Sequence, residues 1–135
     1  MDKRSDEAGF TAIELIIFVV ILIVLAVFFI LQKIDLETSF SDQFRKTSIN
    51  AIYYSLVEVY EPEHGYYPSQ IDPTELKSID PGLLYDPHDV LIGESESEYR
   101  YEGLDCNNAG ECKQFKLTSE MEKEAQYVIE SDGED

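Results

Sequence analysis

Glu14 is the residue whose chemistry stands out most in this sequence. It lies directly before Leu15–Leu31, a run of seventeen apolar residues without a break. A carboxylate at the centre of a membrane-spanning helix costs about 2.5–3.5 kcal/mol on insertion scales, and less near its end. Two interpretations stay open. Glu14 is neutralised by a positive charge inside an apolar bundle, which would offset that cost, or it lies at the lipid headgroups, where an acid suits the start of a helix.

The only two cysteines, Cys106 and Cys112, are separated by a short loop rich in Asn and Gly. Such residues suit a tight turn, so the pair could close a disulfide at the end of a hairpin outside the cytoplasm. In a loop this short the bond would stabilise the fold by about 2–3 kcal/mol. One alternative is half of a metal site, for which the other ligands are not evident. The other is a free pair in a reducing compartment.

Two further groups of side chains could bind a metal, but neither has the spacing of a known site. Oxygen ligands gather around the cysteines, at Asp105, Asn107, Asn108 and Glu111. They fit no calcium-loop signature such as the EF-hand. The two histidines lie near acids in loops: His64, His88, Glu63, Asp86 and Asp89. We therefore predict no cofactor, with calcium as the one open possibility.

Composition and motifs also bear on the class of function. The chain carries 28 acidic and 10 basic residues, for a formal net charge of −18. Phosphates would be repelled, which argues against direct nucleic-acid binding. The sequence has no recognisable nucleophile–base arrangement, phosphate loop or pair of catalytic carboxylates. We therefore predict that the protein is not an enzyme.

The apolar run predicts one membrane span. As a helix, Phe10–Leu31 would be about 33 Å long, close to the ~30 Å of a bilayer core. A secretory signal has a shorter apolar region followed by a cleavage site, and the remaining chain is too small to bury such a helix. The positive-inside rule does not orient the span, because basic residues flank both ends. The cysteine pair favours an external C-terminal part.

Beyond the span, apolar residues recur every three or four positions, which predicts that residues 32–60 continue the helix with one buried stripe. That stripe holds Leu36, Phe40, Phe44, Ile49, Ile52, Tyr53, Leu56, Val57 and Tyr60. The solvent face holds Asp35, Glu37, Asp42, Arg45, Lys46 and Asn50. Pro62 and Gly65 are expected to end the helix. A parallel coiled coil is the alternative, but the stripe is short and rich in aromatic residues.

The rest of the chain predicts a small antiparallel sheet. Residues 98–118 alternate in polarity on either side of the cysteine loop and indicate a hairpin. Pro73–Ser78 has the residues of one or two helical turns, with Asp72 as their cap. A third strand or a docked turn is expected from Tyr127, and the S-D-G-E-D end is expected to be a solvated tail. The fold class is α+β, with a head over residues 61–118 and a partly disordered acidic segment over 119–135.

The stretch G-F-T-A-I-E-L at residues 9–15, followed by the apolar run, resembles the N-terminus of type IV prepilins and type II secretion pseudopilins. The resemblance implies that residues 1–9 are a leader, that a prepilin peptidase cuts between Gly9 and Phe10, and that Phe10 is N-methylated. Glu14 would then be the fifth mature residue. It would meet the Phe10 amine of a neighbouring subunit and set the register of assembly.

Other parts of the chain match that family less completely. E-H-G-Y-Y-P-S after the helix is similar to a turn that often follows the pilin helix. Some secretion pseudopilins bind calcium in a C-terminal loop, which keeps calcium open here. Many relatives have Gly or Pro inside the apolar run, whereas Phe10–Leu31 has neither. The leader is also nearly balanced in charge, where many leaders are basic.

The resemblance implies a pilin-like fold, a long N-terminal helix packed on a small antiparallel sheet. It implies a minor pilin or pseudopilin of a type IV pilus, a type II secretion system or a DNA-uptake filament. The partners would be the prepilin peptidase, other pilin or pseudopilin subunits and an inner-membrane assembly platform. The chain would start in the bacterial cytoplasmic membrane with its C-terminal part outside, and later join a pilus or pseudopilus. The alternative is a single-pass anchored binding or regulatory protein that does not polymerise.

Overall fold

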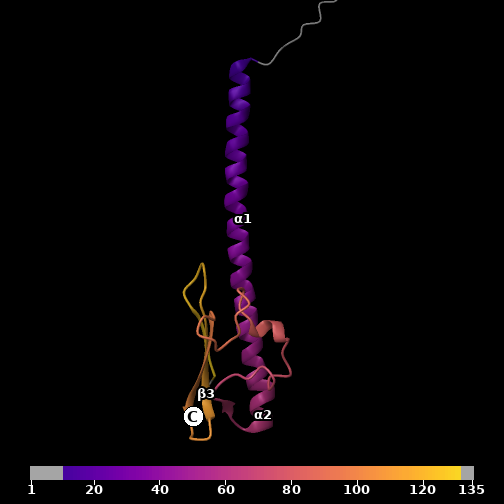
Figure 1. Ribbon diagram of the computed structural model, residues 1–135. Helices are drawn as coiled ribbons and strands as arrows, with labels where there is room; N and C mark the ends of the chain where they lie inside the picture. Colours follow the sequence, from indigo (N-terminus) through magenta and orange to yellow (C-terminus); the bar gives the residue numbers. More distant parts are fainter. Residues whose placement is uncertain (1–10, 132–135) are drawn as a thin grey trace, which may run out of the picture. The chain divides into compact units, whose positions relative to one another are not determined.

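The computed structural model of the chain describes residues 11–131 and has an α+β fold (Figure 1). One long helix, α1, covers Ala12–Ser55, and four short strands form a single antiparallel sheet. The chain divides into two compact units, one up to Glu37 and one from Thr38 onward. The helix belongs to both, so the two units are described in turn.

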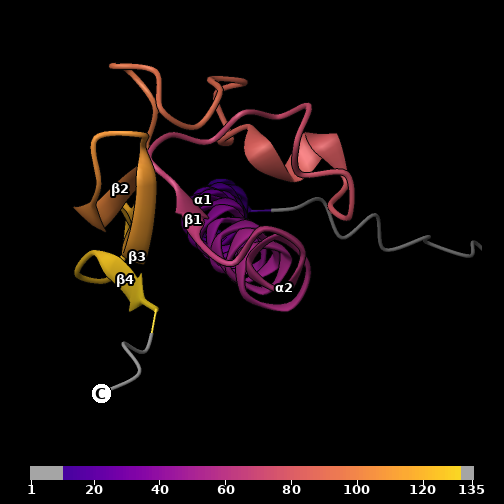
Figure 2. The same cartoon turned by 90° about the horizontal axis from the view of Figure 1, so that it is seen from below.

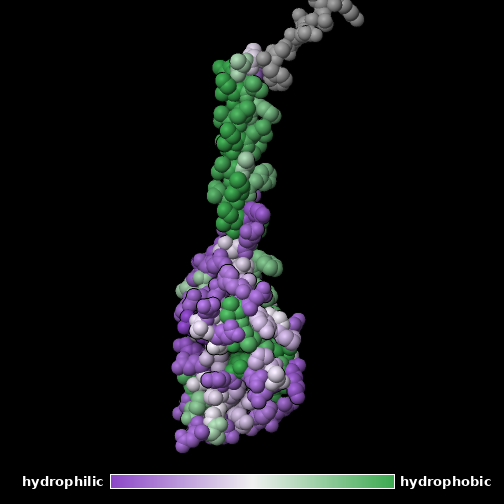
Figure 3. All heavy atoms as spheres, viewed as in Figure 1, coloured by the Kyte–Doolittle hydropathy of each residue, from purple (hydrophilic) through white to green (hydrophobic). Residues whose placement is uncertain are grey.

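The first unit is the apolar part of α1. Every described residue from Thr11 to Glu37 is exposed, and large apolar side chains there, such as Phe18 and Leu31, are about half or more accessible. Figure 3 shows this part of α1 covered by hydrophobic side chains. The helix is long and apolar enough to cross a membrane, and none of its most apolar window is buried. With neither Gly nor Pro in the run, nothing interrupts the helical hydrogen bonds.

In the second unit the helical segment runs further than expected. A π-helical turn, η1, covers Leu56–Tyr60, and α2 covers Glu61–His64. Pro62 does not end the helix, because it falls in the first turn of α2, where its missing N–H costs least. Gly65 does end it, with a left-handed φ of 79° and an amide that donates to the Glu61 carbonyl.

The buried face of this helical segment was predicted only in part. Ile49, Ile52 and Leu56 are fully buried as expected. The predicted burial of Leu36 and Phe40 is wrong, since they are 69% and 75% exposed.

The polar face of the segment also differs from the prediction. Asp42 and Arg45, expected in solvent, are only 6% and 1% exposed. Apolar periodicity could not find this, because a polar segment from the far end of the chain covers that side of the helix.

The sheet is centred on β3, Glu111–Ser119. β2, Tyr99–Cys106, pairs with one edge of β3, with Tyr101 opposite Leu117, which confirms the predicted hairpin. The other edge pairs with two short strands in succession: β1, Tyr67–Pro68, and β4, Tyr127–Glu130. β4 confirms the strand expected from Tyr127. β1 was not predicted, because a strand of two residues is too short to show alternating polarity.

The core lies between the sheet and the helical segment of the second unit (Figure 2). Phe115 is fully buried at its centre, with ring centroids 4.7 Å from Tyr67 and 5.7 Å from Tyr101. The predicted helical turns at 73–78 are wrong. Asp72 does accept the Thr74 amide, but the residues form separate turns. The short helix is η2, a 3₁₀ turn over Pro81–Leu84 capped by Asp80.

Asp86 and Ser131 each connect separate segments of this unit through hydrogen bonds. The buried carboxylate of Asp86 accepts hydrogen bonds from the amides of His88, Val90 and Glu98 at 2.8–3.0 Å. Burial alone would raise the pKa of Asp86, but these three bonds outweigh it and lower that pKa. Ser131, expected in a solvated tail, is instead buried, and its amide donates to the Phe115 carbonyl.

Candidate functional site

The first candidate site is the start of α1, where Thr11 and Glu14 form a reciprocal pair. The Thr11 amide and hydroxyl both donate to Glu14 Oε2 at 3.0 Å, and the Glu14 amide donates to Thr11 Oγ1 at 3.4 Å. This is a capping box, in which a Thr and a Glu three residues apart satisfy each other's helix-start amides. Gly9 and Phe10, the predicted cleavage and methylation residues, lie outside the described residues.

The capping box adds a role for Glu14 that the sequence interpretation had missed. The signal was present, because T-x-x-E before an apolar run is a typical helix start. The predictions from sequence use Glu14 only through its charge. The structure shows that its carboxylate also accepts hydrogen bonds within its own chain, so the predicted assembly role and the capping role must be separated by experiment.

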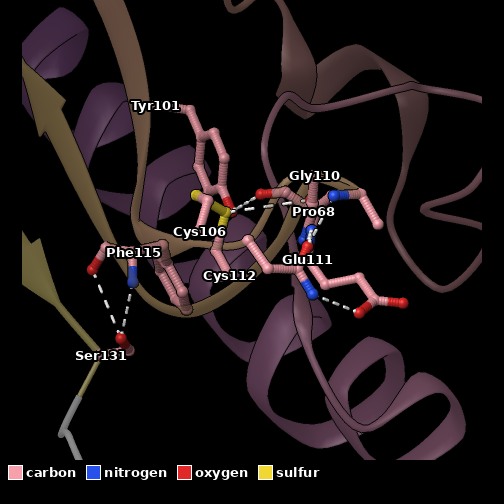
Figure 4. Close-up of a disulfide and its surroundings, with 10 residues drawn as sticks. Pro68, Tyr101, Cys106, Gly110, Glu111, Cys112, Phe115 and Ser131 are labelled. Carbon is pink, nitrogen blue, oxygen red and sulfur yellow. Dashed lines mark hydrogen bonds between the residues drawn. A yellow bond between two sulfur atoms is a disulfide. The ribbon is translucent and has the colours of Figure 1, made fainter.

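The second candidate site is the disulfide between Cys106 and Cys112, which joins the ends of β2 and β3 (Figure 4). Cys112 is buried, whereas Cys106 is exposed. The loop between them is held by Asn107, whose side-chain oxygen accepts the amides of Ala109 and Glu111 at 2.9 and 3.0 Å. Gly110 adopts a φ of 81°, which a residue with a side chain rarely takes.

On β2, Gly103 leaves room for the disulfide, and Tyr101 makes a hydrogen bond beside it. A Cβ added to Gly103 would lie 2.6 Å from the sulfur of Cys112, 3.1 Å from that of Cys106 and 3.2 Å from the Pro68 carbonyl oxygen. The Tyr101 hydroxyl donates to that same carbonyl at 2.6 Å (Figure 4). The disulfide, β1 and β2 therefore meet at one closely packed point.

Gly103→Ala is expected to destabilise the second unit by about 1–3 kcal/mol, because the new methyl group overlaps a sulfur that the closed loop holds in place. The readout is the midpoint of thermal unfolding by near-ultraviolet circular dichroism, for the full chain in detergent. Gly82→Ala is the matched control, since its Cβ would make only an ordinary 3.4 Å contact with Asp80. Equal midpoints for the two variants would contradict the close packing.

Several of the side chains considered as possible metal ligands are engaged in protein contacts. Asn107 donates to Glu111 Oε2 at 2.7 Å, and His64 is bonded through Nδ1 to the Tyr60 carbonyl at 2.9 Å. His88 lies 3.4 Å from Glu98. Among residues 11–131 no group of three or more His, Cys, Asp or Glu residues is placed to hold a metal ion. The structure thus offers no preformed set of ligands over that range.

A third site, which sequence reasoning missed, is built around the buried guanidinium of Arg45. Its Nε donates to Glu98 at 2.8 Å, Nη1 donates to Asp42 at 2.9 Å, and Nη1 and Nη2 donate to Glu122 at 3.1 Å. These carboxylates come from α1, from the residue before β2 and from the connection between β3 and β4. Glu98 and Glu122 lie 53 and 77 residues from Arg45 along the chain, so residue spacing could not predict these contacts.

The charges of this cluster stabilise one another. Burial alone would lower the pKa of Arg45, but the hydrogen bonds to Glu98 and Glu122 outweigh it and raise that pKa. Burial would likewise raise the pKa of Asp42, and hydrogen bonds from the amides of Glu122 and Lys123 and from Arg45 lower it instead. Both groups therefore remain charged at neutral pH.

Comparison of the chain with protein-family models, with curated proteins and with solved structures finds no match.

Proposed function

We propose that the chain is a prepilin-like structural subunit, a minor pilin or pseudopilin that is cut between Gly9 and Phe10 and assembles through its N-terminal helix. One observation supports this most strongly. The apolar residues from Leu15 to Leu31 are all exposed, and they come directly after a single acid at the spacing of the prepilin motif. So large an apolar surface needs a partner, either lipid or other helices.

The second unit also leaves apolar side chains of its helical segment uncovered. Phe40, Tyr54 and Val59 are 75%, 56% and 37% exposed, although the opposite side of the segment packs on the sheet. A helix that only linked an anchor to a head would not need exposed aromatic residues. These positions support packing of the helical segment against neighbouring subunits after the span has left the membrane.

The other features fit this proposal. A disulfide-closed head is typical of a domain displayed outside the cytoplasm. The head is small and the whole chain is strongly acidic, which favours a minor or pseudopilin-type subunit over a DNA receptor. The partners would be the prepilin peptidase, other pilin or pseudopilin subunits and an inner-membrane assembly platform.

Glu14 would have two successive partners under this proposal. In the single chain its carboxylate accepts hydrogen bonds from Thr11. Cleavage after Gly9 would create a positive amine on Phe10, the residue next to Thr11. In a filament, the amine of one subunit and Glu14 of another would neutralise each other in an apolar surrounding.

The alternative function is a single-pass anchored binding or regulatory protein, and processing separates the two. We expect that co-expression with a prepilin peptidase yields a mature chain that begins at Phe10 and carries one N-methyl group. Intact-mass spectrometry of the membrane-extracted protein measures this. Gly9→Leu, which should block cleavage, is the control. A chain that still begins at Met1 beside an active peptidase would support the alternative.

A further inference from the structure

The last described part of the chain is attached differently from the rest of the second unit. Residues 120–131, called here the C-terminal strap, include the β3–β4 connection, β4 and Ser131. The strap borders two elements, the helix α1 and one edge of β3. No residue of the strap belongs to the buried apolar core. Neither attachment is therefore anchored by a large, fully buried side chain of the strap.

Polar contacts attach the strap to α1. The amides of Glu122 and Lys123 donate to the Asp42 carboxylate at 2.9 and 3.0 Å, and Arg45 donates to Glu122. Further hydrogen bonds along the helix include Lys46–Glu124 at 2.7 Å, Lys123–Ser39 at 2.7 Å and Tyr127–Asn50 at 3.2 Å. The strap therefore crosses the helix mainly on charges and hydrogen bonds.

The contact with β3 is short. β4 pairs four residues with Lys116–Ser119, and only Tyr127 and Ile129 pack partly against the core. Ser131 then bonds the amide and carbonyl of Phe115, with its hydroxyl accepting at 2.8 Å and its amide donating at 2.9 Å. On the other edge, β2 pairs with β3 from Cys112 to Ser119 and so holds β3 independently of the strap.

We propose that the C-terminal strap is a detachable element that opens as one unit while the disulfide-closed core stays folded. Its contacts with α1 are mainly electrostatic. Glu122 and the Lys46–Glu124 pair are partly exposed, so salt can screen their charges. Burial of Ile52, Leu56 and Phe115 holds the core and is not weakened by salt. Opening would uncover the edge of β3 from Phe115 to Ser119. This inference does not depend on the pilin proposal.

Salt, rather than physiological pH, is the condition that should open the strap. The groups around Arg45 are Asp42 and Lys46 on α1, Glu98 before β2 with His88 beside it, and Glu122, Lys123 and Glu124 on the strap. The pKa of Asp42 lies below its ordinary 3.8. Its contribution is therefore complete above pH 3.8 and is lost only as the pH falls through the lower, folded value.

Hydrogen–deuterium exchange of the full chain in detergent at pH 7 tests this proposal. Between about 0.05 and 1 M salt, where the Debye length falls from over 10 Å to about 3 Å, strap amides should exchange at least about tenfold faster. Amides of helical residues 49–56, which include the buried Ile49, Ile52 and Leu56, should change less than about twofold. Equal acceleration of both regions, or no acceleration of the strap, would overturn the proposal.

A pair of matched variants provides a second test at low salt. Glu122→Gln removes the carboxylate that faces Arg45, and should speed exchange at residues 126–131 by about fivefold, the change expected for one ion pair worth about 1 kcal/mol. Glu96→Gln makes the same charge change at an exposed residue and should leave exchange unchanged. An equal effect of both variants would mean that overall charge, not the Arg45 contact, controls the strap.

Discussion

Arg45→Met is expected to lower the free energy of unfolding of the second unit by about 3 kcal/mol. Methionine keeps the unbranched stem of arginine but lacks the guanidinium group, so most of the loss would come from carboxylates left without their cation. Asp42 and Glu98 would remain near each other without the cation between them, and removing one partner of a buried ion cluster typically costs about 3–5 kcal/mol. The lower value is appropriate because Glu122 is nearly half exposed.

Urea unfolding of the full chain in detergent measures this effect. All nine tyrosines lie beyond residue 50 and the chain has no tryptophan, so the tyrosine band of the near-ultraviolet circular dichroism spectrum reports on the second unit. Arg100→Met is the matched control. Arg100 is 64% exposed and makes one 3.3 Å contact with Glu120, an arrangement worth at most about 1 kcal/mol. If the two variants unfold at the same urea concentration, the buried cluster stabilises the second unit no more than the exposed Arg100–Glu120 pair does.

The Arg45 cluster also shows why part of this fold could not be predicted from the sequence. Apolar periodicity placed Ile49, Ile52 and Leu56 correctly, because their burial depends on the helix they belong to. Arg45 is buried because carboxylates 53 and 77 residues away surround it. A local pattern counts a charged residue as exposed, and only the tertiary arrangement shows that Glu122 covers it.

The sheet was predicted well where the signal was local. Alternating polarity on both sides of the cysteine loop identified β2 and β3, and the loop composition identified the turn that lets Cys106 and Cys112 meet. β1 and η2 have two and four residues, too few for any period to show. The end of the helix was predicted correctly at Gly65 but not at Pro62, because a π-helical turn places Pro62 in the first turn of α2.

The candidate site at the helix start was predicted from spacing, and the structure changes the experiment that tests it. Glu14→Ala removes both the negative charge and the carboxylate oxygen that accepts the Thr11 amide. A failure of that variant to assemble would therefore have two explanations, a lost charge or a frayed helix start. Loss of a helix cap typically costs about 0.5–2 kcal/mol.

Glu14→Gln separates the two explanations. Glutamine also completes a capping box, since its side-chain oxygen can accept the Thr11 amide, but it carries no charge. If Glu14 neutralises the Phe10 amine of a neighbour, both variants should still be cleaved, and both should be absent from sheared filaments, with at least about a tenfold loss on immunoblots. An uncompensated buried amine costs several kcal/mol, which is more than enough for that loss.

The capping role predicts a different pattern of assembly for the natural chain, Glu14→Ala and Glu14→Gln. If the hydrogen bonds with Thr11 are the main contribution of Glu14, Glu14→Gln should assemble nearly as well as the natural chain and only Glu14→Ala should fail. Thr11→Ala supplies the reciprocal control, because it removes the hydroxyl that accepts the Glu14 amide and leaves the charge in place. Normal assembly of Thr11→Ala beside failure of Glu14→Gln would assign the role of Glu14 to its charge.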